Sequence, residues 1–282
     1  ASELRATGER MLAETREAIE RLAKELDPNT DWVTQLEQAK RDHPPVAQLL
    51  QSYQQEIANI RRFLNENDLV SIPAGEKLLV VETPTFQRSV IPYAAYMPPG
   101  PFDRDQTGQF WVTPVSRETS PRDQETQLQE HCRPHIPITA LHEGYPGHHL
   151  QLCVANGHTS AVRKRAGSDL FAEGWALYCE RLGDEMGMYR TPYERFGMLG
   201  YQIWRATRLV VDTGVHTQGW TRQQAIDYLL KYTTLPAHEV ETEVDRYIAW
   251  PGQALSYYLG EDRKSTRLNS SHITISYAVF CL

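Results

Sequence analysis

Apolar residues recur at helical spacing, among charged positions, over the first 65 residues of the chain. In residues 3–26 this stripe consists of Leu4, Met11, Ile19, Leu22 and Leu26. The spacing predicts an amphipathic helix, which ends where Asp27-Pro28 interrupts the pattern. Asp31 is a candidate N-cap for a second helix that ends near His43. A third helix is expected from about residue 46 to residue 64.

Short apolar runs replace this pattern in the middle of the chain. Lys77–Thr83 (KLLVVET) suits a buried strand, and GQFWVTPV, which ends at Val115, suits another. We expect a small sheet within Leu78–Val115 and a polar surface loop over residues 116–135. The pattern then becomes helical again. The expected helices cover about residues 137–156, 168–187, 191–217, 221–232 and 236–249. The predicted fold class is therefore mainly α with a small β-sheet.

Composition narrows the class of protein. The chain has 282 residues, of which 40% are hydrophobic and 23% charged, as in an ordinary soluble domain with a substantial core. No apolar run approaches the roughly 20 residues that cross a bilayer, and no signal-peptide pattern opens the chain. A net charge of −7 without a basic cluster argues against a nucleic-acid partner. The four cysteines form no C-x-x-C pair, so neither a zinc knuckle nor a disulfide framework is expected.

Residues 262–282 (DRKSTRLNSSHITISYAVFCL) resemble the translation of a sequencing-library adapter. We therefore expect a non-native tail over 262–282 and a single, partial domain over residues 1–261, whose native C-terminus is missing. The tail carries Arg263, Lys264 and Arg267 against Asp262, a net charge of +2. Subtracting it from −7 leaves a net charge of −9 for the rest of the chain.

The segment LHEGYPGHHLQL, residues 141–152, contains the strongest candidate for chemistry. His142-Glu143 opens like the zinc-peptidase signature H-E-x-x-H, in which two histidines one helical turn apart bind a metal. The position four residues after His142 is Pro146, however, and the next histidines are His148 and His149. In a regular helix His148 would be rotated by about 240° from His142, and His149 would lie about 10.5 Å along the axis. A straight helix therefore makes no metal site here.

Pro146 makes a straight helix improbable, because it has no N–H for the carbonyl of His142 and its ring clashes with that carbonyl. Gly144 and Gly147 on either side supply backbone freedom. Two arrangements would bring His148 to the place of the missing ligand. Either the helix bulges across this segment, or it stops and restarts with Pro146 in the first turn of the next helix.

Zinc also requires a third protein ligand, with one position left open for water. The segment DLFAEGWALYCERL supplies Glu173 and Glu180, seven residues apart and so on one face of a helix. We expect Glu173 to complete a site with His142 and His148 for one zinc ion per chain. Glu180 is expected to accept a hydrogen bond that orients a histidine. His149 is either a hydrogen-bonded neighbour or an alternative ligand.

These residues belong to blocks that resemble a bacterial family, domain of unknown function 885, whose members are regarded as predicted zinc metallopeptidases. HEGYPGHHLQ, FAEGWALYCERL, RLVVDTGVHTQGWTRQQA and EVDRYIAWPGQALSYYLG occur in this order, and the likeness covers most of residues 20–261. A more distant likeness is to thimet/oligoendopeptidase-type peptidases, in which H-E-x-G-H precedes a helix with two glutamates seven residues apart. The resemblance implies a helical, zinc-peptidase-like catalytic core that is truncated at both ends.

A peptidase of this kind implies roles for further residues. Glu143, beside the first ligand, would take the proton of a metal-activated water and pass it to the leaving amine. The other candidates are His216 and Tyr257 as catalytic donors to the oxyanion, Arg208 and Arg246 as ligands of a substrate carboxylate, and Asp212 as a residue that orients a histidine. His216 and Tyr257 could instead be packed polar residues, and Arg208 and Arg246 could instead form structural ion pairs.

Three classes of function fit this pattern. The leading hypothesis is zinc-dependent hydrolysis of peptide bonds; the second is a metal-dependent hydrolase of another amide or ester. The third is a non-catalytic, metal-stabilised or peptide-binding protein, against which Glu143 argues, because a structural metal site has no use for a base. The expected partner is a peptide, and the expected location is the bacterial cell envelope or the cytoplasm. Endo- versus exopeptidase action and oligomeric state are not predicted.

Overall fold

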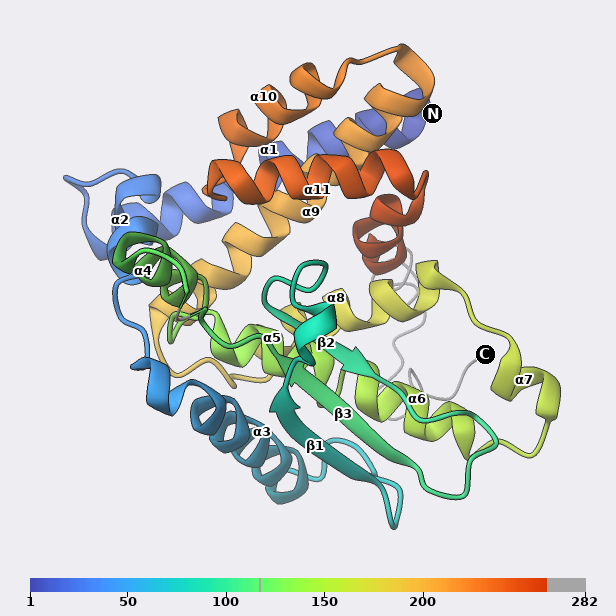
Figure 1. Cartoon of the computed structure of the whole chain (residues 1–282). Coiled ribbons are helices and arrows are strands. Elements are labelled where there is room, and N and C mark those ends of the chain that lie inside the picture. Colours follow the sequence, from blue (N-terminus) through green and yellow to red (C-terminus); the bar gives the residue numbers. More distant parts are fainter. Residues whose placement is uncertain (117, 263–282) are drawn as a thin grey trace.

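The computed structural model describes residues 1–116 and 118–262, so most of the predicted adapter-derived tail lies outside the described residues. The described part is mainly helical with one small sheet, which confirms the predicted fold class (Figure 1). The helices are α1 (Ser2–Leu26), α2 (Trp32–Ala39), α3 (Leu49–Glu66), α4 (Pro121–Glu130), α5 (Ile136–Glu143), α6 (His148–Asn156), α7 (Ala161–Arg165), α8 (Asp169–Glu185), α9 (Pro192–Gln218), α10 (Arg222–Tyr232) and α11 (Ala237–Ala249). The strands are β1 (Lys77–Glu82), β2 (Ala94–Met97) and β3 (Thr107–Val112). Short 3-10 turns are η1 (Val46–Gln48), η2 (Thr85–Gln87) and η3 (Gln253–Leu255).

The three-stranded sheet has the order β1-β3-β2, so β3 is its central strand. β1 runs parallel to β3 with Val80 opposite Phe110, and β2 runs antiparallel to β3 with Tyr96 opposite Phe110. Val80 and Phe110 are buried in a core cluster with Tyr53 of α3. The sheet lies within the predicted region Leu78–Val115 apart from Lys77, the first residue of β1.

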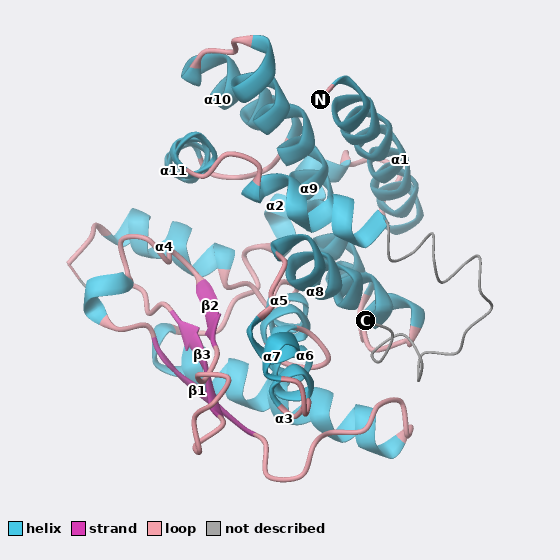
Figure 2. Cartoon of the chain, turned by 90° about the vertical axis from the view of Figure 1, so that its right-hand side faces the viewer, coloured by secondary structure: helices cyan, strands magenta, loops and turns pink. Residues whose placement is uncertain are grey.

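The long helices form a separate layer around α9. α1 packs along α9 so closely that a Cβ on Gly8 would lie 2.6 Å from Cβ of Leu209. α10 and α11 also pack on the C-terminal half of α9, around Val211. In Figures 1 and 2 these helices lie at one end of the molecule and the sheet with α3 at the other. α5 and α8 lie between the two layers, and α6 packs against both of them beside the sheet. These three helices carry the candidate metal-binding residues.

One predicted element is wrong. The polar stretch 116–135 was expected to be a surface loop, but it contains the ten-residue helix α4. The Ser120 side chain caps this helix by accepting a hydrogen bond from the Asp123 N–H (3.2 Å), and Pro121 occupies the first turn. The capping signal was present in the sequence, but the scarcity of apolar residues hid the helix.

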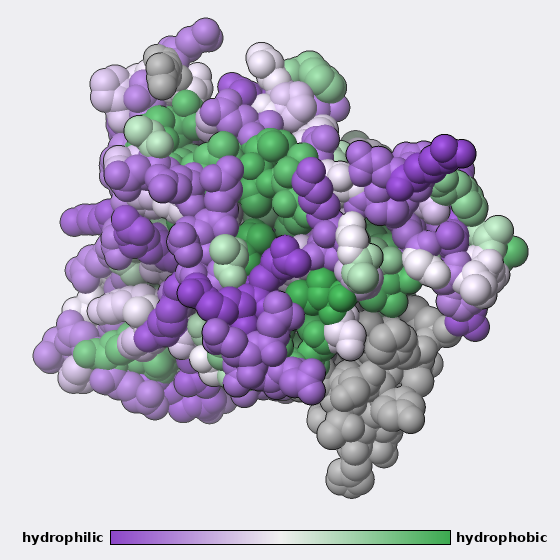
Figure 3. All heavy atoms as spheres, turned by 90° about the horizontal axis from the view of Figure 1, so that it is seen from below, coloured by the Kyte–Doolittle hydropathy of each residue, from purple (hydrophilic) through white to green (hydrophobic). Residues whose placement is uncertain are grey.

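Hydrophilic residues cover most of the face shown in Figure 3, and smaller apolar areas are visible between them. None of the helices in the described ranges has the length and apolar character needed to span a bilayer. Cys132, Cys153 and Cys179 are buried, and none of these three forms a disulfide within the described residues.

Candidate metal centre

The predicted helix over residues 137–156 is broken in two. α5 ends at Glu143 and α6 begins at His148, so the chain stops and restarts and does not bulge. Pro146 lies in the connecting segment, before the first turn of α6, because Gly147 is the N-cap residue. Trp175 of α8 donates a hydrogen bond from Nε1 to the carbonyl oxygen of Pro146 (2.8 Å). The break is therefore tied to the helix that carries the two candidate glutamates.

Gly147 is required by the close return of the chain after the break. Its N–H donates to the carbonyl oxygen of Leu141 (3.0 Å). A Cβ at this position would collide with the carbonyl oxygens of Leu141 and His142. A glycine here thus allows the start of α6 to fold back against the end of α5. This return brings His148 beside His142, with ring centroids 4.8 Å apart.

His142, His148 and Glu173 form the candidate metal site. One ligand atom from each lies within 4.8 Å of the other two. Glu173 Oε2 is 3.3 Å from His148 Nε2 and 3.6 Å from His142 Nε2. This carboxylate oxygen is buried and makes no hydrogen bond within the described residues. Two imidazole nitrogens and one carboxylate oxygen are a donor set that suits zinc with an open position, so the residues present fit the ion.

Glu180 holds His142 in the orientation that the site requires. Its Oε1 lies 2.7 Å from His142 Nδ1, and the Glu180 side chain is fully buried. With Nδ1–H donated to Glu180, the Nε2 of His142 is left to face Glu173. Arg205 of α9 is the second partner of Glu180, with Nη2 at 3.5 Å from the same oxygen. A carboxylate behind a metal-binding histidine is a common way to fix its tautomer.

The pKa values of this group show the site's preference for a cation. Burial alone would lower the pKa of His142, but the nearby carboxylates of Glu173 and Glu180 outweigh burial and raise it to about 10. Burial would likewise raise the pKa of Glu173, but His142 and His148 hold it well below its usual range. Both shifts have the same cause, which is that the carboxylates of Glu173 and Glu180 favour a positive charge between them.

The side chains that would contact substrate lie at the solvent side of the site. His148 and Glu173 are 14% and 17% exposed, so both side chains are partly accessible to solvent. Glu143 directly follows His142 at the end of α5 and is half-buried. The ring of Tyr257 is nearly parallel to that of His142, with an interplanar angle of 18° and centroids 6.3 Å apart. Glu143 and Tyr257 thus both lie next to His142 of the triad.

His149 belongs to a different network, on the sheet side of the break. Its Nε2 lies 2.6 Å from Oε2 of Glu76, which immediately precedes β1, and its Nδ1 lies 3.1 Å from the Tyr96 hydroxyl. Tyr145 donates its hydroxyl to the same Glu76 oxygen (2.6 Å), and Arg61 pairs with the other oxygen (2.7 Å). Glu76 therefore anchors two residues of the broken segment, one on each side of Pro146.

Glu76→Gln is expected to lower zinc affinity by roughly tenfold, because weaker anchoring of the break lets His148 move relative to His142. Competition with a chromogenic chelator measures this change. Glu82→Gln is the matched control, since Glu82 is the last residue of β1, the strand that begins directly after Glu76. Its side chain is 58% exposed and pairs with Arg88 at the surface. Unchanged zinc affinity in a folded Glu76→Gln protein would show that the break holds its shape without this anchor.

His216 and Asp212 contact the last turn of α11 and the loop that follows it. His216 Nε2 lies 3.0 Å from the carbonyl oxygen of Tyr247, and Asp212 accepts a hydrogen bond from the Gly252 N–H (3.1 Å). Neither contact reaches the triad: the His216 contact holds the last turn of α11, and the Asp212 contact holds the loop between α11 and η3. A catalytic role for His216 and an orienting role for Asp212 stay predictions without a supporting contact.

Sequence reasoning missed several partners of the predicted residues. They are Glu76 and Tyr96 beside His149, Arg205 beside Glu180, Gln253 beside Glu173, and Glu243 between Arg208 and Arg246. The sequence did contain a signal that could have pointed to Arg205. Arg205 precedes Arg208 by three residues on an apolar helix, so the two lie on the same face. Glu76 had none, since its partner His149 is 73 residues away.

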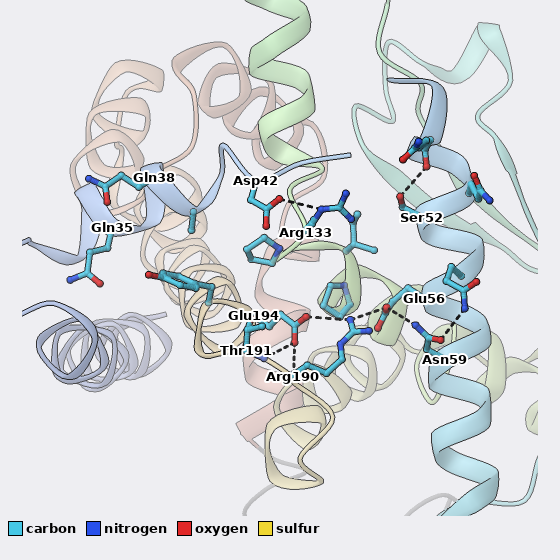
Figure 4. A pocket seen from close by; sticks show the side chains of 18 of the residues that line it. Gln35, Gln38, Asp42, Ser52, Glu56, Asn59, Arg133, Arg190, Thr191 and Glu194 are labelled. Atoms are coloured by element: carbon cyan, nitrogen blue, oxygen red, sulfur yellow. Dashed lines mark hydrogen bonds and ion pairs between the residues drawn. The ribbon is translucent and has the colours of Figure 1, made fainter. Parts of the chain in front are cut away.

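A polar pocket of about 940 Å³ lies elsewhere, between α2, α3 and the start of α9 (Figure 4). No residue of the triad lines it. Most of its charged side chains are paired with one another: Arg190 with Glu56 and Glu194, and Arg133 with Asp42. Asp27 accepts hydrogen bonds from Asn29 and Thr30. Because these charges are paired within the protein, the pocket offers no free charged group for chemistry, and the triad remains the candidate site.

The chain resembles known proteins in both its sequence and its fold. The family model described as "Bacterial protein of unknown function (DUF885)" matches residues 1–267, and the chain belongs to that family. A "putative lipoprotein" from Colwellia psychrerythraea is 25% identical, with a TM-score of 0.82 over 97% of this chain and 48% of that chain. A "putative lipoprotein of unknown function" from Shewanella oneidensis is 23% identical, with a TM-score of 0.83 over 96% of this chain and 50% of that chain. The chain thus spans about half the length of these two proteins. No curated protein matches it.

Proposed function

We propose that the protein is a zinc-dependent peptidase that hydrolyses peptide bonds with a water nucleophile. The observation that carries the proposal is the convergence of His142, His148 and Glu173, whose ligand atoms lie within 4.8 Å of one another. The half-buried carboxylate of Glu143 beside this site favours a hydrolase over a purely structural metal centre, because only catalysis needs a base there. The distant likeness to thimet/oligoendopeptidase-type peptidases supports a peptide as substrate.

A zinc ion bound by the triad would supply a Lewis acid that polarises the scissile carbonyl and lowers the pKa of a bound water. Glu143 would accept the proton of that water and transfer it to the leaving nitrogen. Glu180 keeps His142 in the tautomer that leaves Nε2 free. Tyr257, whose ring stacks on His142, is the candidate donor to the oxyanion. Of the two expected locations, the cell envelope is favoured by the lipoprotein titles of the similar structures.

Elemental analysis and a peptide assay test this proposal together. The purified chain is expected to bind about one zinc ion, to cleave a mixture of internally quenched peptides, to lose this activity with a chelator and to regain it when zinc is restored. A family member of full length, assayed alongside, controls for groups contributed from outside this chain. Absence of bound zinc in both folded proteins, or hydrolysis that persists after complete chelation, would contradict the proposal.

A further inference from the structure

A positively charged cluster adjoins the candidate metal site. Arg208 of α9 and Arg246 of α11 both pair with one carboxylate oxygen of Glu243, at 3.0 Å and 2.8 Å. The Tyr247 hydroxyl donates to the same oxygen (2.7 Å). Burial would raise the pKa of Glu243, but the two guanidinium groups lower it to about 2, so it stays charged. Two positive charges against one negative charge leave this cluster with a net charge of +1.

Two series of contacts, one through Gln253 and one through Tyr257, connect this cluster with the triad. Gln253 Nε2 is 3.5 Å from Glu173 Oε1, and Gln253 Oε1 accepts from Arg246 Nη1 (2.8 Å). Across one amide group, these contacts place the Arg246 nitrogen within about 9 Å of the Glu173 carboxylate. Tyr257 provides the second route, because its ring lies against His142 on one side and 4.4 Å from Arg208 Cζ on the other.

Arg208 has unused capacity to bind an anion. Its side chain is only 4% exposed, and its Nη1 is buried without a hydrogen-bond partner in the described part of the chain. The rings of Trp204 and Tyr257 lie 4.3 Å and 4.4 Å from its Cζ. An unsatisfied buried donor on a charged group is costly, and such groups are normally satisfied by protein, water or ligand. Arg246 has a neutral partner, Gln253, that a carboxylate could replace with a stronger, charge-assisted bond.

We propose that Arg208 and Arg246 form a subsite for the C-terminal carboxylate of the peptide substrate, so that the enzyme removes residues from the C-terminal end. This inference rests on the proposed peptidase function. A carboxylate one or two residues beyond the scissile bond lies about 4–8 Å from the reacting carbonyl carbon, which matches the reach between the triad and the cluster. Water adds its oxygen to the carbonyl carbon, the C–N bond breaks, and the leaving nitrogen takes up a proton to release an amino acid or dipeptide.

Zinc-loaded Glu143→Gln protein allows the subsite to be tested by binding, because it should hold peptides without turning them over. Equilibrium dialysis with mass-spectrometric detection compares N-acetylated peptides that carry a free C-terminal carboxylate with the same peptides amidated. We expect the acids to bind about 10- to 100-fold more tightly, as for hydrogen bonds to charged groups. Adding Arg246→Gln should abolish this preference. Adding Arg222→Gln should keep it, because Arg222 pairs with Asp245 at the surface and is 44% exposed.

Arg246→Gln is chosen because Arg246 is 22% exposed, whereas Arg208 is buried and its loss could unfold the protein. Equal binding of acids and amides would overturn the subsite while leaving the peptidase proposal intact. Zinc binding without retention of either peptide set would also overturn the subsite. Failure to bind zinc would instead remove the proposed function, and this inference with it. Stepwise shortening of peptides from the C-terminus by the unmodified protein would be the matching positive result.

Discussion

Glu143→Gln is expected to lower the rate of peptide hydrolysis by about a thousandfold while leaving the zinc content at about one ion per chain. The amide is nearly isosteric with the carboxylate but cannot accept the proton of the attacking water, and general acid–base groups typically contribute 10²- to 10⁴-fold. Glu143 is not part of the triad, so its loss should not remove a ligand. Turnover numbers and elemental analysis on the same preparation measure both effects.

The control for this variant is Glu185→Gln, a substitution with the same chemistry at the end of α8, where the side chain is 54% exposed. It should change neither zinc content nor rate. Activity within a few-fold of the unmodified protein in Glu143→Gln would exclude Glu143 as the base. Loss of zinc in the same variant would mean that Glu143 is a ligand, and the assignment of the triad would then be wrong.

The parts of the fold that follow from local patterning were predictable. The helices α1, α8, α9, α10 and α11 begin and end within a few residues of their expected bounds, because each has an apolar stripe and clear end signals. α9, for example, has Thr191 as N-cap in a capping box with Glu194, and it ends at Gly219 in the left-handed conformation. The sequence pattern did not predict α4, because the capping signal at its N-terminus is followed by a stretch with few apolar residues.

The candidate site likewise has residues that the sequence predicts and contacts that it does not predict. His142, Glu143, Glu173 and Glu180 could be predicted because each lies in a short motif whose spacing has a physical meaning. The choice between two forms of the break could not be made from the sequence, since it depends on contacts from other elements, such as the Trp175 bond to Pro146. Glu76, Gln253 and Glu243 come from segments far from their partners in the chain, and no local pattern predicts such contacts.

The two adjacent histidines, which the sequence left ambiguous, are expected to differ sharply on substitution. His148→Ala should lower zinc affinity by at least about a thousandfold, because structural zinc sites gain roughly 10–16 kcal/mol from only a few ligands. His149→Ala should lower it by about 10- to 100-fold at most, as expected for a residue behind the ligands. The reason is positional: His148 Nε2 faces Glu173 at 3.3 Å, whereas both ring nitrogens of His149 are taken by Glu76 and Tyr96.

Zinc affinity measured by chelator competition on both variants separates these roles, with His238→Ala as a control at a residue that is 66% exposed. Folding must be compared as well, because His149 is fully buried and its loss should lower the free energy of unfolding more than that of His148. The expected result is therefore a crossed pattern, in which one variant loses metal and the other mainly loses stability. If His149→Ala lost the metal and His148→Ala kept it, the restart of α6 at His148 would have to shift by one residue. The Glu76 contact would then be a feature of the metal-free protein alone.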